Sequence, residues 1–306
     1  MPSKETKEDA RTGMVGAPRE MRGTLKRYEH FPSRFVTPRH VDVWLPPGHD
    51  SSSTRYPVLY MHDGQNLFDP ATSFTGVTWG IDEAMGTLGD AGTISLAIVV
   101  GIWNTVDRTR EYMPEKPCAE YVSAEQRNAL AGFYGTPMSD RYLRFVVEEA
   151  KAFVDAAYKT RTGRGFTFIM GSSMGALVSL YAVCRYPDVF GGAACLSTHW
   201  PAGQGMMVRY LKDSLPNFST HKFYFDHGTE NLDAQYETYQ QEADAVFKEA
   251  GYVEERNWMS RKLPGHDHSE TYWKQRAPDA WAFLLGRGSR QAGHVCLVSV
   301  CRCLNP

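Results

Sequence analysis

The chain runs from Phe166 to Leu180 as FTFIMGSSMGALVSL. The first residues of this stretch are apolar and mostly aromatic or β-branched, whereas the last ones place apolar side chains at helical spacing. Between them lies a Gly-x-Ser-x-Gly motif, in which Gly171 and Gly175 flank Ser173. A side chain at either glycine is expected to crowd the turn. The stretch therefore predicts a strand, a sharp turn and a helix, with the Ser173 hydroxyl exposed at a helix N-terminus that stabilises negative charge, and Ser173 is a candidate nucleophile.

The composition is that of an ordinary globular protein. The chain has 306 residues, 42% hydrophobic and 22% charged, with a net charge of −2. No basic run or basic patch with interleaved aromatic residues is present, so no nucleic-acid partner is expected. The amino terminus lacks an apolar segment of signal-peptide type, and no apolar run reaches membrane-spanning length. We therefore predict no membrane association, a small-molecule substrate and, by default, a cytoplasmic location.

The two ends of the chain differ from its middle. Residues 1–19 are charged, contain Gly and Pro and show no periodicity, which predicts disorder. Residues 288–306 form an irregular tail with Cys296, Cys301 and Cys303. Because no Cys-x-x-Cys spacing is present, a loose tail is favoured over a zinc site. Residues 20–287 are predicted to form one domain.

Strand and helix patterns alternate through that domain. An edge hairpin is expected near residues 23–45, and buried strands at 56–62, 94–101, 166–171, 190–196, 221–226 and 255–263. Helices are expected from Trp79, over 139–158, after Gly175, and over 234–250 and 272–285. This order predicts an α/β fold with a mostly parallel sheet, helices on both faces and an antiparallel N-terminal edge hairpin. Residues 113–138 lack periodicity and are longer than a usual connection, which favours a functional loop or lid.

A serine nucleophile needs a base to accept its proton and an acid to orient that base. Two histidines, His266 and His268, follow the last predicted strand. The strand before it ends at Asp226, and two further acidic residues, Glu230 and Asp233, follow it. Each group therefore comes just after the carboxyl end of a strand, in the chain order serine, acid, histidine. An acidic residue at this position would also be stabilised by the dipole of the next helix, because it lies near the N-terminus of that helix, and this would require no role in catalysis.

Several segments together resemble the Putative esterase family, which includes enterochelin-type siderophore esterases, feruloyl and acetylxylan esterases, S-formylglutathione hydrolase and mycolyltransferases. The resemblance covers residues 23–285 and implies an α/β-hydrolase fold, a serine nucleophile and neither a metal nor an organic cofactor. It is carried by Tyr60–Phe68, Val100–Asn104, Arg110–Tyr112, Gly171–Gly175 and His268–Trp273.

The resemblance also bears on the base and the acid. In similar esterases the base stands five residues before a tryptophan that opens the last helix, which favours His268 over His266 because Trp273 has that spacing. Asn231 stands where a common family pattern has Asp, which leaves Asp233, slightly favoured, and Glu230, with Asp226 a distant third because it still belongs to the predicted strand. Some related siderophore esterases use a Ser-His pair alone.

The oxyanion hole is expected from two backbone N–H groups, that of Met174 and that of Gln65 or Gly64. The predicted activity is a serine carboxylesterase acting through an acyl-enzyme on a sugar-linked acetyl or feruloyl ester or a siderophore-type ester. The alternatives are an acyltransferase with the same Ser-His machinery and a non-catalytic binding protein of the same fold. Candidate substrate contacts on loops at the carboxyl edge of the sheet are Trp103, Asn104, Arg108, Arg110, Glu111, Tyr112, His199 and Trp200.

Overall fold

A computed structural model describes residues 20–287 of the chain. Eight strands form one sheet in the order β1-β2-β4-β3-β5-β6-β7-β8. Strands β1 and β2 pair antiparallel, as do β2 and β4, whereas all other neighbours are parallel. The predicted mostly parallel sheet with an antiparallel N-terminal hairpin at its edge is therefore confirmed. The strands are β1 (Thr24–Phe31), β2 (Arg39–Leu45), β3 (Val58–His62), β4 (Ile98–Ile102), β5 (Thr167–Ser172), β6 (Gly192–Leu196), β7 (Lys222–Gly228) and β8 (Trp258–Leu263).

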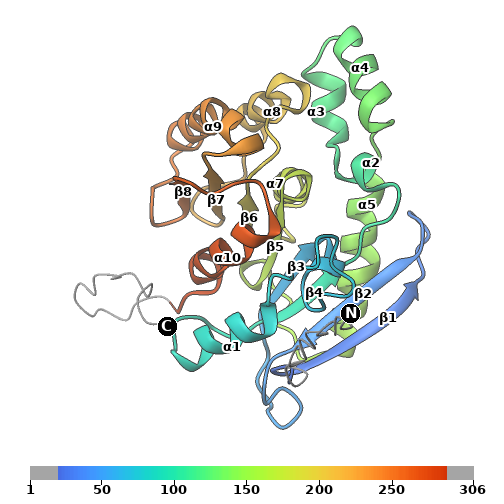
Figure 1. Cartoon of the computed structure of the whole chain (residues 1–306), viewed down its shortest axis with the longest axis vertical. Coiled ribbons are helices and arrows are strands. Elements are labelled where there is room, and N and C mark those ends of the chain that lie inside the picture. The colour runs from blue at the N-terminus through green and yellow to red at the C-terminus, as the bar shows by residue number, and fades with distance from the viewer. Residues whose placement is uncertain (1–19, 288–306) are drawn as a thin grey trace, which may run out of the picture.

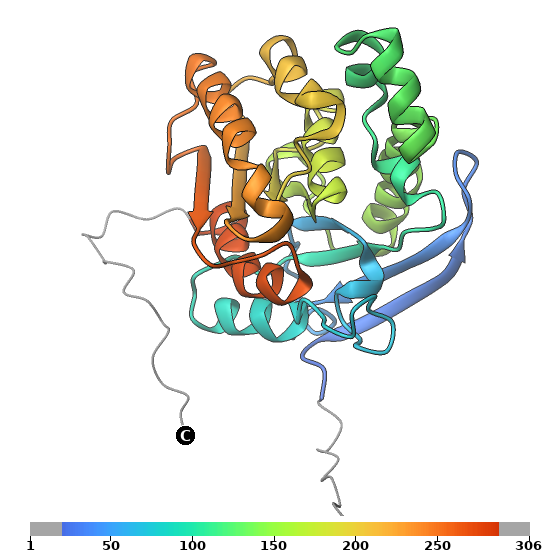
Figure 2. The same cartoon turned by 45° about the horizontal axis from the view of Figure 1, so that its top comes forward.

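The central strands are apolar on both faces because both faces are covered. Along β3, Val58 and Tyr60 join one hydrophobic cluster, whereas Leu59 and Met61 join the other. This division follows from the two-residue period of a strand. Figures 1 and 2 show α1 and α10 on one side of the sheet and α7, α8 and α9 on the other. These helices are α1 (Ile81–Asp90), α7 (Met174–Arg185), α8 (Met206–Ser214), α9 (Glu237–Glu249) and α10 (Glu270–Leu285).

The predicted helix over residues 139–158 is present, but it is not a uniform α-helix. It consists of α5 (Ser139–Arg144), a π-helical segment (Phe145–Ala150) and α6 (Lys151–Ala157). A π segment inside an α-helix shifts the helical repeat locally. The apolar pattern of the sequence did not reveal this shift, because the residues inside the π segment are as apolar as their neighbours.

Residues 113–138, which the sequence pattern presented as a loop or lid, contain two helices. They are α3 (Glu115–Glu120) and α4 (Ala124–Tyr134), and they follow the short α2 (Arg108–Tyr112). Helix α4 begins with a capping box, in which the Gln126 N–H donates to Ser123 Oγ and the Ser123 N–H donates to the Gln126 side-chain oxygen. No residue of α4 is buried, so the amphipathic periodicity that reveals most helices is absent. Figure 2 shows α3 and α4 standing beside α8 and α5.

Some sequence predictions fall outside the described residues. The disorder predicted for residues 1–19 and the irregular tail predicted for residues 288–306 both do so. Within residues 20–287, no helix is both long and apolar enough to cross a membrane. In the same range, no group of three or more His, Cys, Asp or Glu side chains is arranged to hold a metal ion.

Candidate active site

Ser173 forms the turn between β5 and α7 by itself. β5 ends at Ser172 and α7 begins at Met174, and Ser173 has φ 56° and ψ −122°. A non-glycine residue with positive φ is strained, and such strain clusters at functional sites. The two flanking glycines make the turn fit: a Cβ on Gly171 would lie 2.6 Å from the Gly175 carbonyl carbon, and one on Gly175 would lie 3.3 Å from His62 Cβ. The local pattern of the sequence therefore suffices to explain this turn.

His268 and Asp233 come together from two different loops. His268 follows β8, and Asp233 belongs to a 3₁₀ helix, η5 (Asn231–Gln235), that follows β7. His268 Nδ1 lies 2.6 Å from Asp233 Oδ1. Burial alone would raise the pKa of Asp233, but hydrogen bonds from His268, Ser197 and the Gly228 backbone hold it below its ordinary value. Asp233 is therefore an ionised acceptor that orients His268. The Nε2 atom of His268, on the opposite side of the ring, is left to accept a proton.

The alternative acid and base lie elsewhere. The Glu230 side chain is exposed, and the Thr229 hydroxyl donates to it at 3.3 Å. The ring of His266 packs on Tyr272 with centroids 4.4 Å apart, and its backbone oxygen accepts bonds from the Thr229 and Glu230 N–H groups. His266 thus joins the loops after β7 and β8. Among the predicted acids and bases, only Asp233 and His268 have the geometry of a catalytic pair.

Tyr236 connects the base with the nucleophile. Its ring lies edge-on to His268, with centroids 5.6 Å apart and planes at 85°. Burial raises the pKa of Tyr236, whereas a hydrogen bond with Ser173 acts in the opposite direction. One aromatic side chain therefore contacts both Ser173 and His268. The sequence offered no signal for this tyrosine, because it lies beyond the acidic loop in a stretch with several tyrosines.

The loop after β3 lies against the start of α7. It contains the 3₁₀ helix η1 (Gly64–Asn66), and a Cβ on Gly64 would lie 2.6 Å from the Gly101 carbonyl carbon, so only glycine fits there. A Cβ on Gly175 would lie 3.5 Å from Asp63 Oδ2, which shows how closely this loop approaches the Ser173 turn. The N–H groups of Met174 and Gln65 both belong to the first turn of a helix, where backbone N–H groups have no intrahelical acceptor. Both are therefore suited to an oxyanion.

Arg108 and Asn104 hold the loop after β3 in place. Arg108 Nε and Nη2 each donate to Asp63 at 2.7 Å, one bond to each carboxylate oxygen. Asn104 Nδ2 donates to Asp63 Oδ1 at 2.6 Å, and the Asn104 N–H donates to Gln65 Oε1 at 3.3 Å. Asp63 itself has a left-handed conformation with φ 55°. These two residues, predicted as substrate contacts, instead position the predicted oxyanion loop.

Replacing Arg108 with glutamine is expected to lower kcat by roughly 10²-fold, because a small displacement of an oxyanion donor has a cost of that order. Steady-state hydrolysis of p-nitrophenyl acetate measures the effect. Arg110→Gln is the matched control, since Arg110 bonds to Asp107 at 2.8 Å and to the Thr136 carbonyl, and touches no part of this loop. Equal losses in the two variants would contradict the assigned role of Arg108.

The other predicted substrate contacts have mostly structural surroundings. Glu111 forms a buried pair with Arg39, with N–O distances of 2.6 and 2.7 Å. Trp103 Nε1 donates to Asp42 at 2.9 Å. Tyr112 and Trp200 are buried, with exposed fractions of 0% and 1%. A substrate cannot reach the last two side chains in this structure, and we leave both out of the proposed site.

His199 joins helix α4 to the site. Its Nε2 lies 2.9 Å from the Tyr134 hydroxyl of α4, and its Nδ1 lies 3.0 Å from the Tyr236 hydroxyl. Burial lowers the pKa of His199 to about 4, with contributions from His268 and Arg108. The ring is therefore neutral near pH 7 and acts as a bridge between two hydroxyl groups, one of which contacts Ser173.

The lowered pKa values of two histidines, the buried His62 and the partly buried His199, indicate how stability should depend on pH. Burial lowers the pKa of His62 to about 3 and that of His199 to about 4. Both values lie below the ordinary value near 6.5, so the unfolded chain binds these protons first as the pH falls. We therefore expect the free energy of unfolding to be highest above pH 6.5 and to fall towards pH 4, by up to about 1.4 kcal/mol per pH unit for each histidine.

Urea denaturation followed by circular dichroism at several pH values tests this expectation. His62→Gln should flatten the dependence, whereas replacing the exposed His30 with Gln should leave it unchanged. The same slope in His62→Gln and in the wild type would contradict it.

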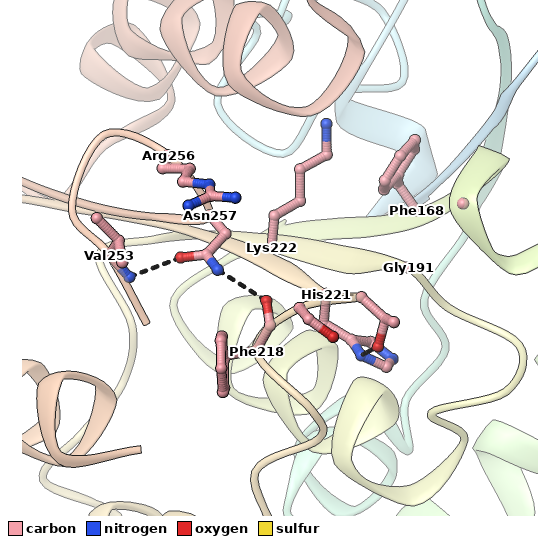
Figure 3. Close-up of a pocket in the computed structure, with 11 residues that line it drawn as sticks. Phe168, Gly191, Phe218, His221, Lys222, Val253, Arg256 and Asn257 are labelled. Atoms are coloured by element: carbon pink, nitrogen blue, oxygen red, sulfur yellow. Dashed lines mark hydrogen bonds between the residues drawn. The ribbon is translucent and has the colours of Figure 1, made fainter. Parts of the chain in front are cut away.

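A cavity of about 330 Å³ lies at the other end of the sheet (Figure 3). Phe168 and Lys222 stand at the amino ends of β5 and β7, so this cavity is far from the carboxyl ends that carry Ser173, Asp233 and His268. Burial lowers the pKa of Lys222 to about 8, and its Nζ donates to the carbonyl groups of Phe283 and Leu284 at the end of α10. His221 and Asn257, which also line the cavity, bond to backbone carbonyl groups as well.

Comparisons with known proteins identify the family. A family model described as Putative esterase matches residues 33–290. The uncharacterized protein YbbA of Bacillus subtilis is 21% identical over 276 residues, which cover 87% of this chain and 98% of that protein. The siderophore enterobactin esterase of Emericella nidulans is 28% identical over 159 residues, which cover 50% of each protein.

A ferulic acid esterase of known structure superposes with a TM-score of 0.63 at 16% identity, covering 86% of this chain and 98% of that one. This likeness confirms the predicted α/β-hydrolase fold, and the family model extends over most of the described residues. The chain belongs to the Putative esterase family and is a carboxylic ester hydrolase.

Proposed function

We propose that this chain is a serine esterase in which Ser173 is the nucleophile, His268 the general base and Asp233 the acid. The observation that carries the proposal is the strained Ser173 turn beside a hydrogen-bonded His268–Asp233 pair, with Tyr236 in contact with both sides. The sequence placed each group after the carboxyl end of a strand, and parallel strands direct those ends to one edge of the sheet.

The proposed reaction has two halves. Ser173 Oγ attacks the ester carbonyl carbon while its proton moves to His268 Nε2, and the carbonyl oxygen becomes an oxyanion that the N–H groups of Met174 and Gln65 stabilise. The C–O bond to the alcohol then breaks, and His268 returns the proton to the departing alcohol. In the second half, water attacks the acyl carbon while its proton moves to His268 Nε2. The bond to Ser173 Oγ then breaks, His268 returns the proton to that oxygen, and the acid is released.

We propose as substrate class a sugar-linked acetyl or feruloyl ester, or a siderophore-type ester. Support comes from two similar proteins, one described as a siderophore enterobactin esterase and the other as a ferulic acid esterase. The experiment is a hydrolysis screen over p-nitrophenyl esters, acetylated and feruloylated sugars and a catecholate trilactone, together with labelling by a fluorophosphonate. Labelling of Ser173, located by mass spectrometry, is the expected result. Ester hydrolysis by a protein whose Ser173 is never labelled would overturn the proposed mechanism.

A further inference from the structure

A buried arginine lies behind the proposed triad acid. Arg276 belongs to α10, which packs across β6 and β7, and it is 2% exposed. Its Nη1 lies 3.6 Å from Asp233 Oδ2 and 3.5 Å from Asp226 Oδ1. One cation therefore lies between the proposed triad acid and a second buried carboxylate.

Ser197 connects Arg276 to Asp233 by hydrogen bonds. Arg276 Nη2 donates to Ser197 Oγ at 2.8 Å, and Trp273 Nε1 donates to the same oxygen at 3.0 Å. These two donors occupy the acceptor sites of the hydroxyl, so its only proton is directed to Asp233 Oδ2, which lies 2.7 Å away. Ser197 is fully buried and has φ 44°, a strained conformation that its surroundings maintain. These hydrogen bonds therefore orient the Asp233 carboxylate through Oδ2, the oxygen that does not contact His268.

Asp226 has no contact with the reacting groups. It is fully buried, and the side chains that favour its charged form are those of Arg276 and Tyr224. Burial raises the pKa of Asp226 to about 7 although Arg276 acts in the opposite direction, so this carboxylate carries its charge mainly above neutral pH. A buried charge is costly without a partner of opposite sign. Asp226 and Arg276 are each other's partner of opposite charge.

The charge on Asp226 determines the net charge of this buried cluster after a proton moves to His268. With Asp226 ionised, the cluster of Asp226, Arg276 and Asp233 has a net charge of −1, and a protonated His268 makes the total zero. With Asp226 uncharged, the same proton transfer leaves a net charge of +1 in a buried region. The first situation stabilises the imidazolium, because electrostatic interactions are strong in a region shielded from water.

We propose that Asp226 is a positioning residue of this esterase, which neutralises Arg276 so that Arg276 and Ser197 orient Asp233 without weakening its support of protonated His268. The inference rests on the proposed function of Ser173, His268 and Asp233. It assigns a role to an acidic residue that the sequence presented only as a weak candidate for the triad acid.

Other titratable groups also face this cluster, and all of them stay unchanged in the variants below. Their constant contribution lets a shift be attributed to the replaced charge. They are Tyr224 in β7, Arg261 in β8, His199 after β6, Tyr236 before α9, and His266 and Asp267 on the loop that carries His268.

The test is the pH dependence of kcat/KM for p-nitrophenyl acetate. Asp226→Asn keeps the size of the side chain but leaves Arg276 without its counter-charge. We expect the midpoint of the acidic limb to move to lower pH by roughly half a unit or more, and kcat to fall about 10-fold. The double variant Asp226→Asn/Arg276→Gln removes both charges, so its midpoint should return towards that of the wild type. A merely structural role predicts lost activity without this return.

Two further variants sharpen the test. Arg276→Lys keeps the cation but loses the hydrogen bond to Ser197, so kcat should fall with the midpoint near that of the wild type. Glu242→Gln removes an exposed carboxylate from α9 and should change neither quantity. Thermal unfolding establishes that each variant is folded, and Arg276→Lys separates charge from hydrogen bonding even if Asp226→Asn does not fold.

The inference is overturned by an unchanged or raised midpoint in Asp226→Asn, or by an Arg276→Lys shift as large as the one expected for Asp226→Asn. Ser173→Ala distinguishes this failure from failure of the proposed function. If Ser173→Ala abolishes activity while the Asp226→Asn midpoint does not move, only the role of Asp226 is wrong. If Ser173→Ala remains active, the underlying mechanism is wrong.

Discussion

Replacing Ser173 with alanine is expected to lower kcat by roughly 10⁵- to 10⁶-fold, the order of loss seen when the nucleophile of a serine hydrolase is removed. The reason is that no other hydroxyl occupies the strained turn at the start of α7, where φ is 56° and the helix N-terminus faces the reacting carbonyl. The variant should fold normally, because alanine fills less space than serine and Ser173 is only partly buried.

Hydrolysis of p-nitrophenyl acetate and labelling by a fluorophosphonate measure this effect together. Ser172→Ala is the matched control, since Ser172 is the preceding residue and is buried at the end of β5. It should retain labelling and most of its activity. Wild-type turnover by Ser173→Ala, with unchanged labelling, would contradict the assignment of the nucleophile.

Replacing Asp233 with asparagine is expected to lower kcat by roughly 10³- to 10⁴-fold. An asparagine amide can present an N–H group to His268 Nδ1, and it then stabilises the tautomer whose Nε2 already carries a proton. Such an imidazole cannot accept the proton of Ser173. The loss should be in kcat rather than in KM, because Asp233 is fully buried and does not reach the substrate.

Glu230→Gln is the control for this prediction, because the sequence presented both residues as the acid. The Glu230 side chain is exposed and, in the described part of the chain, bonds only to the Thr229 hydroxyl, so its replacement should leave kcat within about twofold. A large loss in Glu230→Gln and a small one in Asp233→Asn would reverse the assignment.

The choice of the proposed acid could not be made from the sequence. Glu230 and Asp233 lie three residues apart on one loop, and both suit the start of the next helix. η5 turns Asp233 inward, where Gly228 and Ser197 donate to it, and leaves Glu230 in solvent. Which side of a short 3₁₀ helix faces the site depends on the loop after β8, and that information is not local to the sequence.

The proposed base was indicated by the family resemblance. His268 stands at a fixed spacing before Trp273, and Trp273 packs edge-on against His268 with ring centroids 4.9 Å apart. This spacing is a feature of similar esterases, so the family resemblance, and not a local rule of helix geometry, pointed to His268, which lies two residues before α10 begins. His266, two residues earlier, lies instead against Tyr272.

By itself, the sequence determined the Ser173 turn, the mostly parallel sheet and the order of serine, acid and histidine along the chain. These follow from local steric rules and from the two-residue period of strands, which neighbouring residues are enough to express. Only the tertiary structure decided which carboxylate orients His268, that α4 reaches the site through Tyr134, and that Arg276 lies between two buried carboxylates. Those arrangements depend on side chains that come from elements far apart in the sequence and meet in a buried region. A charge buried there without a partner of opposite sign is strongly destabilising, so charged groups must be paired.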